Sequence, residues 1–205
     1  MKIEYLGHSC FRLTRQDGYQ IVIDPYDVGS VPGVELIQPL EADAVYCSHE
    51  HGDHHAIHLV TLKDEVPDPN VLTHSFLVPH DDAEGTLRGM NLIQVFSMDG
   101  VRLAHLGDLG RMLNEEEIAQ LKNVDVLCIP CGGYYTIDKE IARQVIDAIQ
   151  PKVTILMHYR TDTFGFDVLE HLDTIETTFP ELQKLEQTSI ETPFPEGIFT
   201  LQPLQ

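Results

Sequence analysis

The sequence predicts one α/β domain spanning residues 1–205, in which an antiparallel part leads into alternating strands and helices. Near the amino terminus, short apolar runs are separated by tight turns, as in an antiparallel meander. Further on, Ile141, Val145 and Ile149 recur every four residues, which is the spacing of a helix that buries one face. A chain of 205 residues with 42% hydrophobic residues can form one sizeable core.

Apolar periodicity and the residues that end each element assign strands and helices along the chain. Strands are expected at residues 3–6, 10–14, 20–24, 44–47, 71–78, 92–98, 101–106, 124–129, 153–157 and 197–202. Helices are expected at residues 57–62, after Asn114, between Asp138 and Pro151, and at residues 167–177. Residues 26–40 contain two glycines and two prolines without periodicity, so we expect a loop there.

Residues 49–55 contain four histidines and an aspartate in the pattern HxHxDH, carried by His49, His51, Asp53 and His54. This segment follows the predicted strand at 44–47, and histidines two residues apart at a strand end project to one side. A sharp turn at the intervening glycine would bring Asp53 and His54 back to the same point from the first turn of a helix. Imidazole and carboxylate ligands together favour zinc, with iron or manganese as alternatives.

Three further candidate ligands lie just beyond the ends of other predicted strands. His80 follows the strand at 71–78, and Asp108 follows the strand at 101–106. His158 directly follows the strand at 153–157. Because α/β folds gather their active sites at the carboxyl ends of strands, we expect these side chains to complete the metal site.

These motifs together resemble the metallo-β-lactamase superfamily of metal-dependent hydrolases, and are most similar to its compact bacterial branch that includes ascorbate-6-phosphate lactonase. The segments that carry the resemblance occur in the expected order: Leu6-Gly7-His8-Ser9-Cys10-Phe11, the HxHxDH motif, His80, Gly107-Asp108, residues 129–133 and Met157-His158-Tyr159. The resemblance implies a four-layer αββα sandwich with the site along one edge. It also implies His49, His51 and His80 on one metal ion, Asp53, His54 and His158 on a second, and Asp108 bridging both.

The resemblance implies a catalytic site with two divalent ions, with Zn²⁺ expected and Mn²⁺ or Fe²⁺ as alternatives. A water activated between the ions would cleave an ester-like bond in a small molecule, namely a lactone, carboxylic ester, phosphodiester or thioester. Asp108 would bridge the ions, and Asp53 would orient the water and pass a proton to the leaving group.

Three residues are candidates for substrate contacts. His8 lies in a Gly-His-Ser turn that, by the resemblance, approaches the site. Arg111 and Arg160 each follow a proposed ligand by two or three residues, and either could hold an anionic group. Surface ion pairs with Glu115 and Asp162 are the alternative for the two arginines.

Other histidines offer alternatives within the metal site. His74 competes with His80 as the third ligand of the first ion, although the resemblance favours His80. His58 forms a four-residue pair with His54 and could bind metal with it. His105 is expected to be structural or on the surface.

Composition restricts the partners. The net charge of −20, from 33 acidic and 13 basic residues, would repel nucleic acid. The partner is therefore expected to be a small-molecule substrate, including anionic ones, and a homo-oligomer remains open. Four cysteines without disulfide spacing, no apolar run of membrane-spanning length and no leader-like amino terminus lead us to expect a cytoplasmic protein with no membrane association.

Three other functions are weighed against the small-molecule hydrolase. A nuclease-like phosphodiesterase of the same superfamily would usually need a basic surface. A flavodiiron-type oxidoreductase carries glutamate in place of the second motif histidine, where this chain has His51. A non-catalytic metal-binding protein would be expected to lack Asp53 or Asp108, and both are present.

Overall fold

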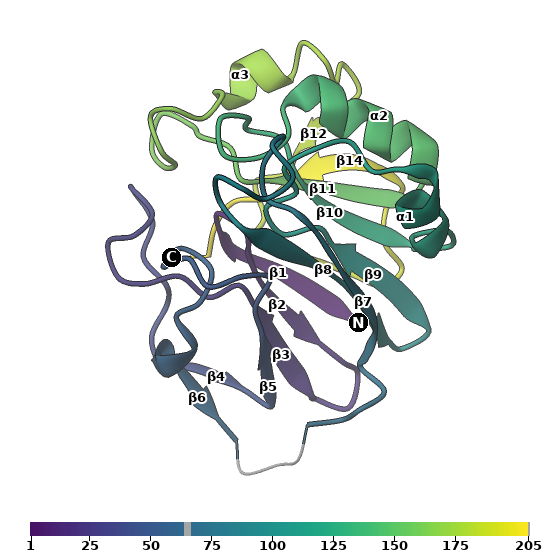
Figure 1. Cartoon of the computed structure of the whole chain (residues 1–205). Coiled ribbons are helices and arrows are strands. Elements are labelled where there is room, and N and C mark those ends of the chain that lie inside the picture. The colour runs from purple at the N-terminus through teal and green to yellow at the C-terminus, as the bar shows by residue number, and fades with distance from the viewer. Residues whose placement is uncertain (64–66, 205) are drawn as a thin grey trace.

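Two β-sheets form the middle of the computed structural model, which describes residues 1–63 and 67–204 (Figure 1). The first sheet contains β1 (Lys2–Gly7), β2 (Cys10–Thr14), β3 (Gln20–Ile23), β5 (Ala44–Tyr46) and β13 (Ser189–Glu191), in the order β13-β1-β2-β3-β5. The second contains β7 (Leu72–Pro79), β8 (Met90–Met98), β9 (Val101–His105), β10 (Val126–Pro130), β11 (Val153–Met157), β12 (Gln183–Lys184) and β14 (Gly197–Thr200), in the order β12-β14-β11-β10-β9-β8-β7.

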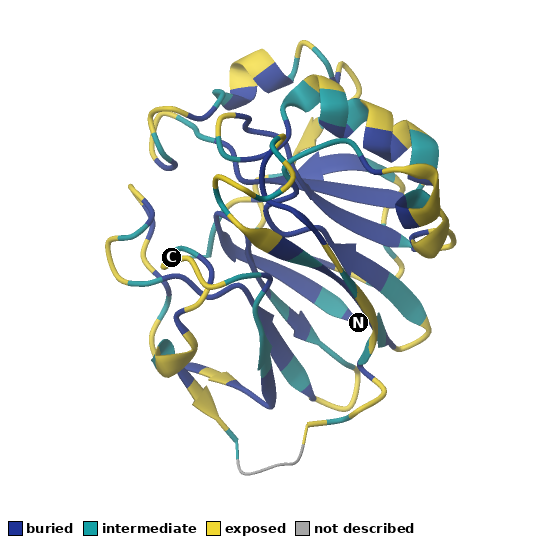
Figure 2. Ribbon diagram, viewed as in Figure 1, coloured by how far each residue is buried: buried dark blue, intermediate teal, exposed yellow. Residues whose placement is uncertain are grey.

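The alternation of side chains along each strand builds the core between the sheets. Ile3 and Tyr5 of β1 lie in the same buried cluster as Ile155 of β11, so the two sheets pack face to face. The neighbouring residues Leu6 and Leu156 point the other way and join the second cluster, beneath the outer layers. Figure 2 shows the strands of both sheets as largely buried.

Each sheet is covered on its outer face. The helices α1 (Glu115–Gln120) and α2 (Lys139–Ile149) cover the seven-stranded sheet. The five-stranded sheet is covered by the loop at residues 26–40 and the parallel pair β4 (Leu40–Ala42) and β6 (Val60–Leu62). The predicted sandwich fold is confirmed. Its outer layer over the five-stranded sheet consists of a loop and short strands and not of a helix.

Both predicted helix starts are confirmed by their caps. Asn114 accepts a hydrogen bond from the Glu117 amide, and the Glu117 carboxylate accepts one from the Asn114 amide, which is a capping box. Asp138 accepts from the Ile141 amide at the start of α2. These bonds satisfy amides that have no partner within the helix, which explains why the helices begin there.

Two predicted helices are wrong in extent or type. Residues 57–62 form a 3₁₀ turn, η1 (Ile57–Leu59), followed by β6, because the backbone from Val60 onward pairs with β4. In the segment 167–177 only α3 (Leu172–Ile175) is helical. There the Glu170 amide donates to Gly132 instead of to a helical carbonyl, and the Leu169 amide donates to Phe166, so the preceding residues form a turn and not a helix.

The strands β4, β12 and β13 were not predicted. Each has three residues or fewer, which is too short for an alternating pattern to identify. All four cysteines are unpaired, as their spacing predicted, and Cys128 and Cys131 are fully buried. No helix among residues 1–63 and 67–204 is long and apolar enough to cross a membrane.

A buried ion pair on the first sheet gives a test of pH-dependent stability. Arg12 binds both oxygens of the Glu4 carboxylate at 2.8 and 3.1 Å, and Lys2 donates to it at 2.9 Å. Burial alone would raise the pKa of Glu4, but these donors outweigh it and hold the pKa below its usual value. The pair therefore stabilises the fold fully above the unfolded-state pKa of about 4.3. That contribution disappears as the pH falls through the folded-state value.

Glu4→Gln is expected to lower the free energy of unfolding by about 1–3 kcal/mol at pH 7. The difference from wild type should shrink at pH 3.5. Urea unfolding at both pH values measures it, with the exposed Glu41→Gln as a control that stays near wild type. A difference that is the same at both pH values would show that the carboxylate charge is not what stabilises the pair.

Candidate metal centre

The HxHxDH segment lies in the connection between β5 and η1. The expectation that Asp53 and His54 begin a helix is wrong, because the structure has a turn there, closed by a hydrogen bond from the His54 amide to the His51 carbonyl. Gly52 accepts from the Asp27 amide at 2.9 Å, and the Ala56 amide donates to Pro25 at 2.7 Å. The backbone groups that a helix would use are therefore bonded to the loop that follows β3.

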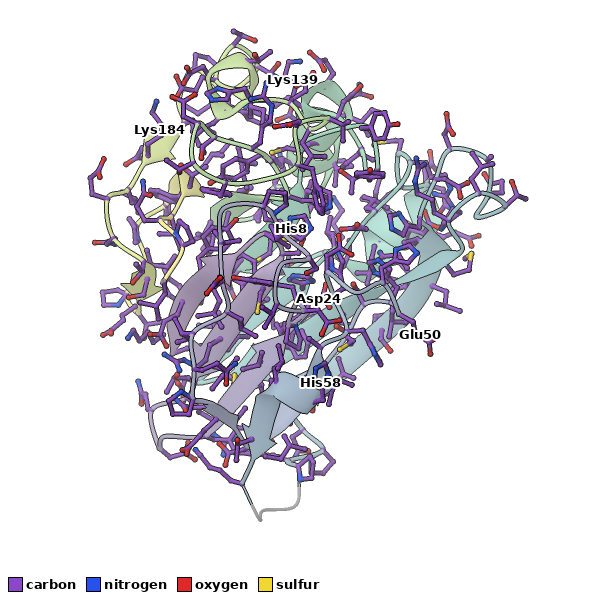
Figure 3. The ribbon with its side chains drawn as sticks, turned by 90° about the vertical axis from the view of Figure 1, so that its left-hand side faces the viewer. His8, Asp24, Glu50, His58, Lys139 and Lys184 are labelled. Carbon is purple, nitrogen blue, oxygen red and sulfur yellow. The ribbon has the colours of Figure 1, made fainter. Side chains whose placement is uncertain are left out.

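The structure brings all seven predicted metal ligands to one place, at the edge where strands of both sheets end. The ligand atoms form two main groups, each within 4.8 Å of one another: His49, His51 and His80, and Asp53, His54 and His158 together with His8. Figure 3 shows His8 and Asp24 in the middle of the molecule, whereas the exposed Glu50 lies toward its edge.

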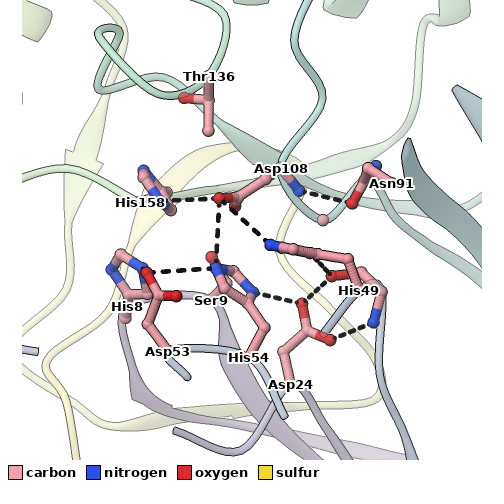
Figure 4. Close-up of polar contacts among 12 residues, drawn as sticks. His8, Ser9, Asp24, His49, Asp53, His54, Asn91, Asp108, Thr136 and His158 are labelled. Carbon is pink, nitrogen blue, oxygen red and sulfur yellow. Dashed lines mark hydrogen bonds and ion pairs between the residues drawn. The ribbon is translucent and has the colours of Figure 1, made fainter. Parts of the chain in front are cut away.

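Asp108 lies between the two groups (Figure 4). Its Oδ2 atom is 3.3 Å from the Nε2 atoms of His54, His80 and His158, and 4.0 Å from that of His49. The side chain is 3% exposed. One carboxylate oxygen thus faces both ligand groups, which is the position that a bridging ligand needs.

Several buried polar atoms at this point have no hydrogen-bond partner. Among the described residues these include His49 Nε2, His54 Nε2, Asp108 Oδ1 and both ring nitrogens of His158. Buried polar atoms are normally paired, because leaving one unsatisfied is unfavourable. Their concentration here, all on metal-ligating residue types, fits divalent cations bound among them.

The protonation of the cluster also favours cations. Burial lowers the pKa of His49 to about 3, so its ring is neutral at physiological pH and can donate a lone pair. Burial also acts on His54, but the carboxylates of Asp108 and Asp24 outweigh it and raise the pKa of this ring. The centre therefore attracts positive charge.

Asp24, at the end of β3, is a functional residue that the sequence analysis missed. Its buried carboxylate accepts from the Ser48 amide and hydroxyl, both at 2.6 Å, and from His54 Nδ1 at 2.8 Å. Because Nδ1 donates to Asp24, Nε2 of His54 is the nitrogen that remains for a metal ion, beside Asp108. Ser48 Oγ accepts from His49 Nδ1 at 2.9 Å and orients that ring in the same way. The only signal in the sequence is an aspartate at a strand end.

The segment that carries Asp108 is fixed from the neighbouring strands. Asn91 accepts from the Asp108 amide at 2.9 Å and donates to the Leu106 carbonyl at 2.8 Å. His105 Nδ1 accepts from the Gly107 amide at 3.2 Å. His105 is fully buried and holds this turn. Of the two expectations for His105, a structural role or a surface position, the structural role agrees with this position.

Two glycines allow the ligand-bearing turns to pack backbone against backbone. A Cβ atom on Gly110 would lie 2.1 Å from the Asp81 amide nitrogen, next to His80. A Cβ on Gly132 would lie 2.1 Å from the carbonyl oxygen of His158. Any larger residue would displace these turns, so the positions of His80 and His158 depend on the absence of a side chain at both sites.

A family model described as Beta-lactamase superfamily domain matches residues 2–158, a range that includes every predicted metal ligand. The chain belongs to the metallo-β-lactamase superfamily.

Similar members of this superfamily come from bacteria and archaea. A UPF0173 metal-dependent hydrolase of Carboxydothermus hydrogenoformans is 28% identical over 194 residues, covering 78% of this chain and 85% of the relative. A UPF0173 metal-dependent hydrolase of Archaeoglobus fulgidus is 29% identical over 196 residues, covering 78% and 84%. A Thermotoga maritima structure assigned to the Zn-dependent hydrolases of the superfamily has a TM-score of 0.70 and 28% identity, covering 98% of this chain and 99% of that one.

In this metallo-β-lactamase superfamily protein, a cavity of about 440 Å³ opens beside the metal ligands. Its lining includes the predicted ligands His51, His80 and Asp108, together with Ser30, Arg88, Tyr135 and Phe166. Arg88 and the two aromatic residues were not singled out from the sequence. Nothing in the spacing of residues 81–89 indicated that this loop turns back over the site.

The structure does not bring the two predicted arginines into the cavity. Arg111 binds both oxygens of Glu117 at 2.9 Å, so its guanidinium is held against α1. Arg160 Nε donates to the Leu169 carbonyl at 2.8 Å. Arg111 therefore forms an ion pair, as the alternative prediction had it, but its partner is Glu117 and not Glu115.

The alternative ligands also lie apart from the cluster. His74 is exposed on β7, where its Nε2 is 2.8 Å from the Gln120 side-chain oxygen. His58 is exposed, and its Nε2 lies 3.4 Å from Asp27. His8, in contrast, joins the second ligand group, with Nε2 at 3.3 Å from Asp53 Oδ2. Burial and the neighbouring His158 lower the pKa of His8 to about 4, so this ring is neutral.

Proposed function

We propose that this protein is a metal-dependent hydrolase that uses two divalent ions, in the first place Zn²⁺, to cleave an ester-like bond in a small molecule. The observation that carries the proposal is the meeting of two ligand groups at Asp108, beside a cavity of small-molecule size. When bound, two such ions supply an activated water and polarise the scissile bond, which removes the need for a protein nucleophile. The names of the relatives, which are metal-dependent hydrolases, support the same class.

The residues of the chain have separate roles in this proposal. Asp108 compensates the charge of both ions, and Asp24 keeps His54 in the ligating tautomer. Asp53 is 22% exposed toward the cavity, so it can orient the attacking water and carry a proton to the leaving group. The neutral ring of His8 lies beside Asp53 and holds its carboxylate in position. Ser30 also lines the cavity, but its hydroxyl donates to the Asp27 carbonyl.

The substrate is proposed to be a lactone, carboxylic ester, phosphodiester or thioester of low molecular weight. The cavity of about 440 Å³ suits such a molecule, and the net charge of −20 opposes a nucleic acid. The nuclease-like alternative therefore has less support. The non-catalytic alternative is disfavoured because the Asp53 and Asp108 carboxylates both line the cavity beside the histidines.

Elemental analysis of zinc-reconstituted protein is expected to give two equivalents of metal per chain, because the two ligand groups hold more ligands than one ion can use. His80→Ala should lose metal, whereas the matched variant His74→Ala, which removes an exposed histidine from β7, the strand that leads to His80, should keep both equivalents. One equivalent or fewer in the wild type would contradict the dinuclear site. A screen of the four ester classes tests the activity, and no turnover by the fully loaded protein would contradict the hydrolase.

A further inference from the structure

Arg88 differs from every other basic side chain of the protein. All 13 lysines and arginines lie in the described part of the chain. Twelve of them bind a carboxylate or a backbone carbonyl: Lys2, Arg12, Arg15, Lys63, Arg102, Arg111, Lys122, Lys139, Arg143, Lys152, Arg160 and Lys184. The guanidinium of Arg88 forms no ion pair or hydrogen bond with another described residue and lies over the ring of Tyr135, at 5.2 Å from its centroid. Among residues 1–63 and 67–204, Arg88 is thus the one lysine or arginine without an ion-pair or hydrogen-bond partner for its side chain, and it lines the cavity.

The loop that carries Arg88 is held in place by a buried carboxylate. Asp81 is 2% exposed, and its two oxygens accept four backbone N–H groups, those of Ala83, Gly85, Leu87 and Arg88, at 2.7–3.0 Å. The loop also returns to the metal ligands, because the His80 amide donates to the Gly89 carbonyl at 3.0 Å. The backbone of Arg88 is therefore fixed relative to His80, while its guanidinium remains available.

Two aromatic rings of the cavity lining connect Arg88 with His8. Tyr135 meets Phe166 edge to face at 6.0 Å between ring centroids, and Phe166 meets His8 in the same way at 5.6 Å. The metal ligands His51, Asp53 and His80 line the same cavity. The cavity thus offers a cation at one end of a row of two aromatic rings, and His8 of the second ligand group at the other end of that row.

We propose that Arg88 binds an anionic oxygen group of the substrate, a carboxylate or a phosphate, at the end of the molecule remote from the bond that is cleaved. An apolar segment joins the two ends and packs on Tyr135 and Phe166. The proposal deepens the proposed function and rests on it for the position of the scissile bond. A guanidinium matches two anionic oxygens at once, and such charge-assisted pairs are stronger than neutral hydrogen bonds. An unpaired guanidinium needs no partner to be displaced before it binds this group.

Binding of small acids by the zinc-loaded protein tests the proposal without turnover. The probes share one carboxylate and three methylene groups and differ at the other end, which is a methyl in pentanoate, a carboxylate in glutarate and a phosphonate in 4-phosphonobutyrate. Homologues with four and five methylene groups vary the reach. Isothermal titration calorimetry should show at least one length at which a doubly anionic probe binds about tenfold or more tightly than its methyl-ended counterpart. Whether carboxylate or phosphonate binds more tightly identifies the group that the site prefers.

Arg88→Gln is expected to abolish this preference, and Arg88→Lys to retain part of it, because lysine keeps the charge and loses the fork. Both variants should fold, since the hydrogen bond to Asp81 comes from the backbone amide of residue 88. Arg102→Gln removes the same charge where the side chain binds only the carbonyls of Lys122 and Asn123, and should leave the preference unchanged.

A wild type with no preference at any length, or an Arg88→Gln variant that keeps it, would overturn the proposal. These outcomes are separate from failure of the hydrolase. Selective binding without hydrolysis of any ester class would leave the Arg88 site standing and remove the activity. Hydrolysis without selective binding would leave the proposed hydrolase standing and remove the Arg88 site.

Discussion

Asp108→Asn is expected to reduce turnover about a thousandfold or more, the equivalent of roughly 4 kcal/mol of lost transition-state stabilisation. The substitution keeps the size of the side chain and removes the charge that faces His54, His80 and His158 at 3.3 Å. Without that charge, two nearby ions would repel each other uncompensated. We therefore expect metal content to fall together with kcat, as measured by elemental analysis and by hydrolysis of the substrate that the screen identifies.

The fold should tolerate this change, because the backbone amide of residue 108 still donates to Asn91. Circular dichroism and thermal unfolding check that the variant is native. Asp82→Asn removes the same charge from an exposed position near the cavity and should behave as wild type. If the Asp108 variant hydrolyses the substrate at a near wild-type rate with two metal equivalents, the bridging role is wrong.

Asp24→Asn is expected to weaken metal binding about 10- to 100-fold, although Asp24 itself is not a proposed ligand. In the wild type, Oδ2 accepts from Ser48 Oγ and from His54 Nδ1. If the amide oxygen of asparagine accepts from the Ser48 amide, its NH₂ group faces His54 Nδ1, which must then act as an acceptor. The hydrogen moves to Nε2, and the imidazole loses the lone pair that would bind metal.

Competition with a chelating dye measures the metal affinity of this variant. Asp43→Asn is the matched control, because Asp43 is also buried and accepts a backbone amide at 2.6 Å, but its partners are Gln20 and Lys63, outside the metal centre. The control should lose stability without losing metal affinity. An Asp24 variant with wild-type affinity and a lower unfolding temperature would reduce Asp24 to a structural residue.

The ligands could be found from the sequence because each follows a run of residues whose pattern predicts a strand. His80 and His158 stand directly beyond β7 and β11, and Asp108 comes three residues after β9. Where the end of a strand can be predicted from the sequence, the position of the next side chain at the edge of the sheet can be predicted too. The same argument explains why the fold could be predicted through most of its strands.

The residues that position the ligands could not be found in this way. Asp24 acts through His54, and Asn91 acts through Asp108, so their roles depend on contacts between segments far apart in the chain. Only the packing of β3 beside β5, and of β8 beside β9, makes these pairs neighbours.

The arginines show how proximity in sequence can mislead. Arg111 follows Asp108 closely, but the capping residue Glu117 holds its guanidinium, so it does not reach the cavity. Arg88 is eight residues beyond His80, and the hydrogen bonds of Asp81 fold its loop back over the site. A loop held by one carboxylate shows no regular spacing of apolar residues in the sequence. The path of its chain is set by hydrogen bonds that only the folded structure reveals.

Each of the two ligand groups draws on both halves of the sandwich. His49 and His51 extend from the five-stranded sheet and His80 from the seven-stranded sheet, and the second group likewise joins Asp53 and His54 to His158. A bound ion would therefore act as a removable cross-link between the sheets, present only when the chain is folded. Its binding free energy then adds to the free energy of folding, and chelation would loosen the sandwich as well as stop the chemistry. In a cell, the supply of metal would set the lifetime of this protein along with its activity.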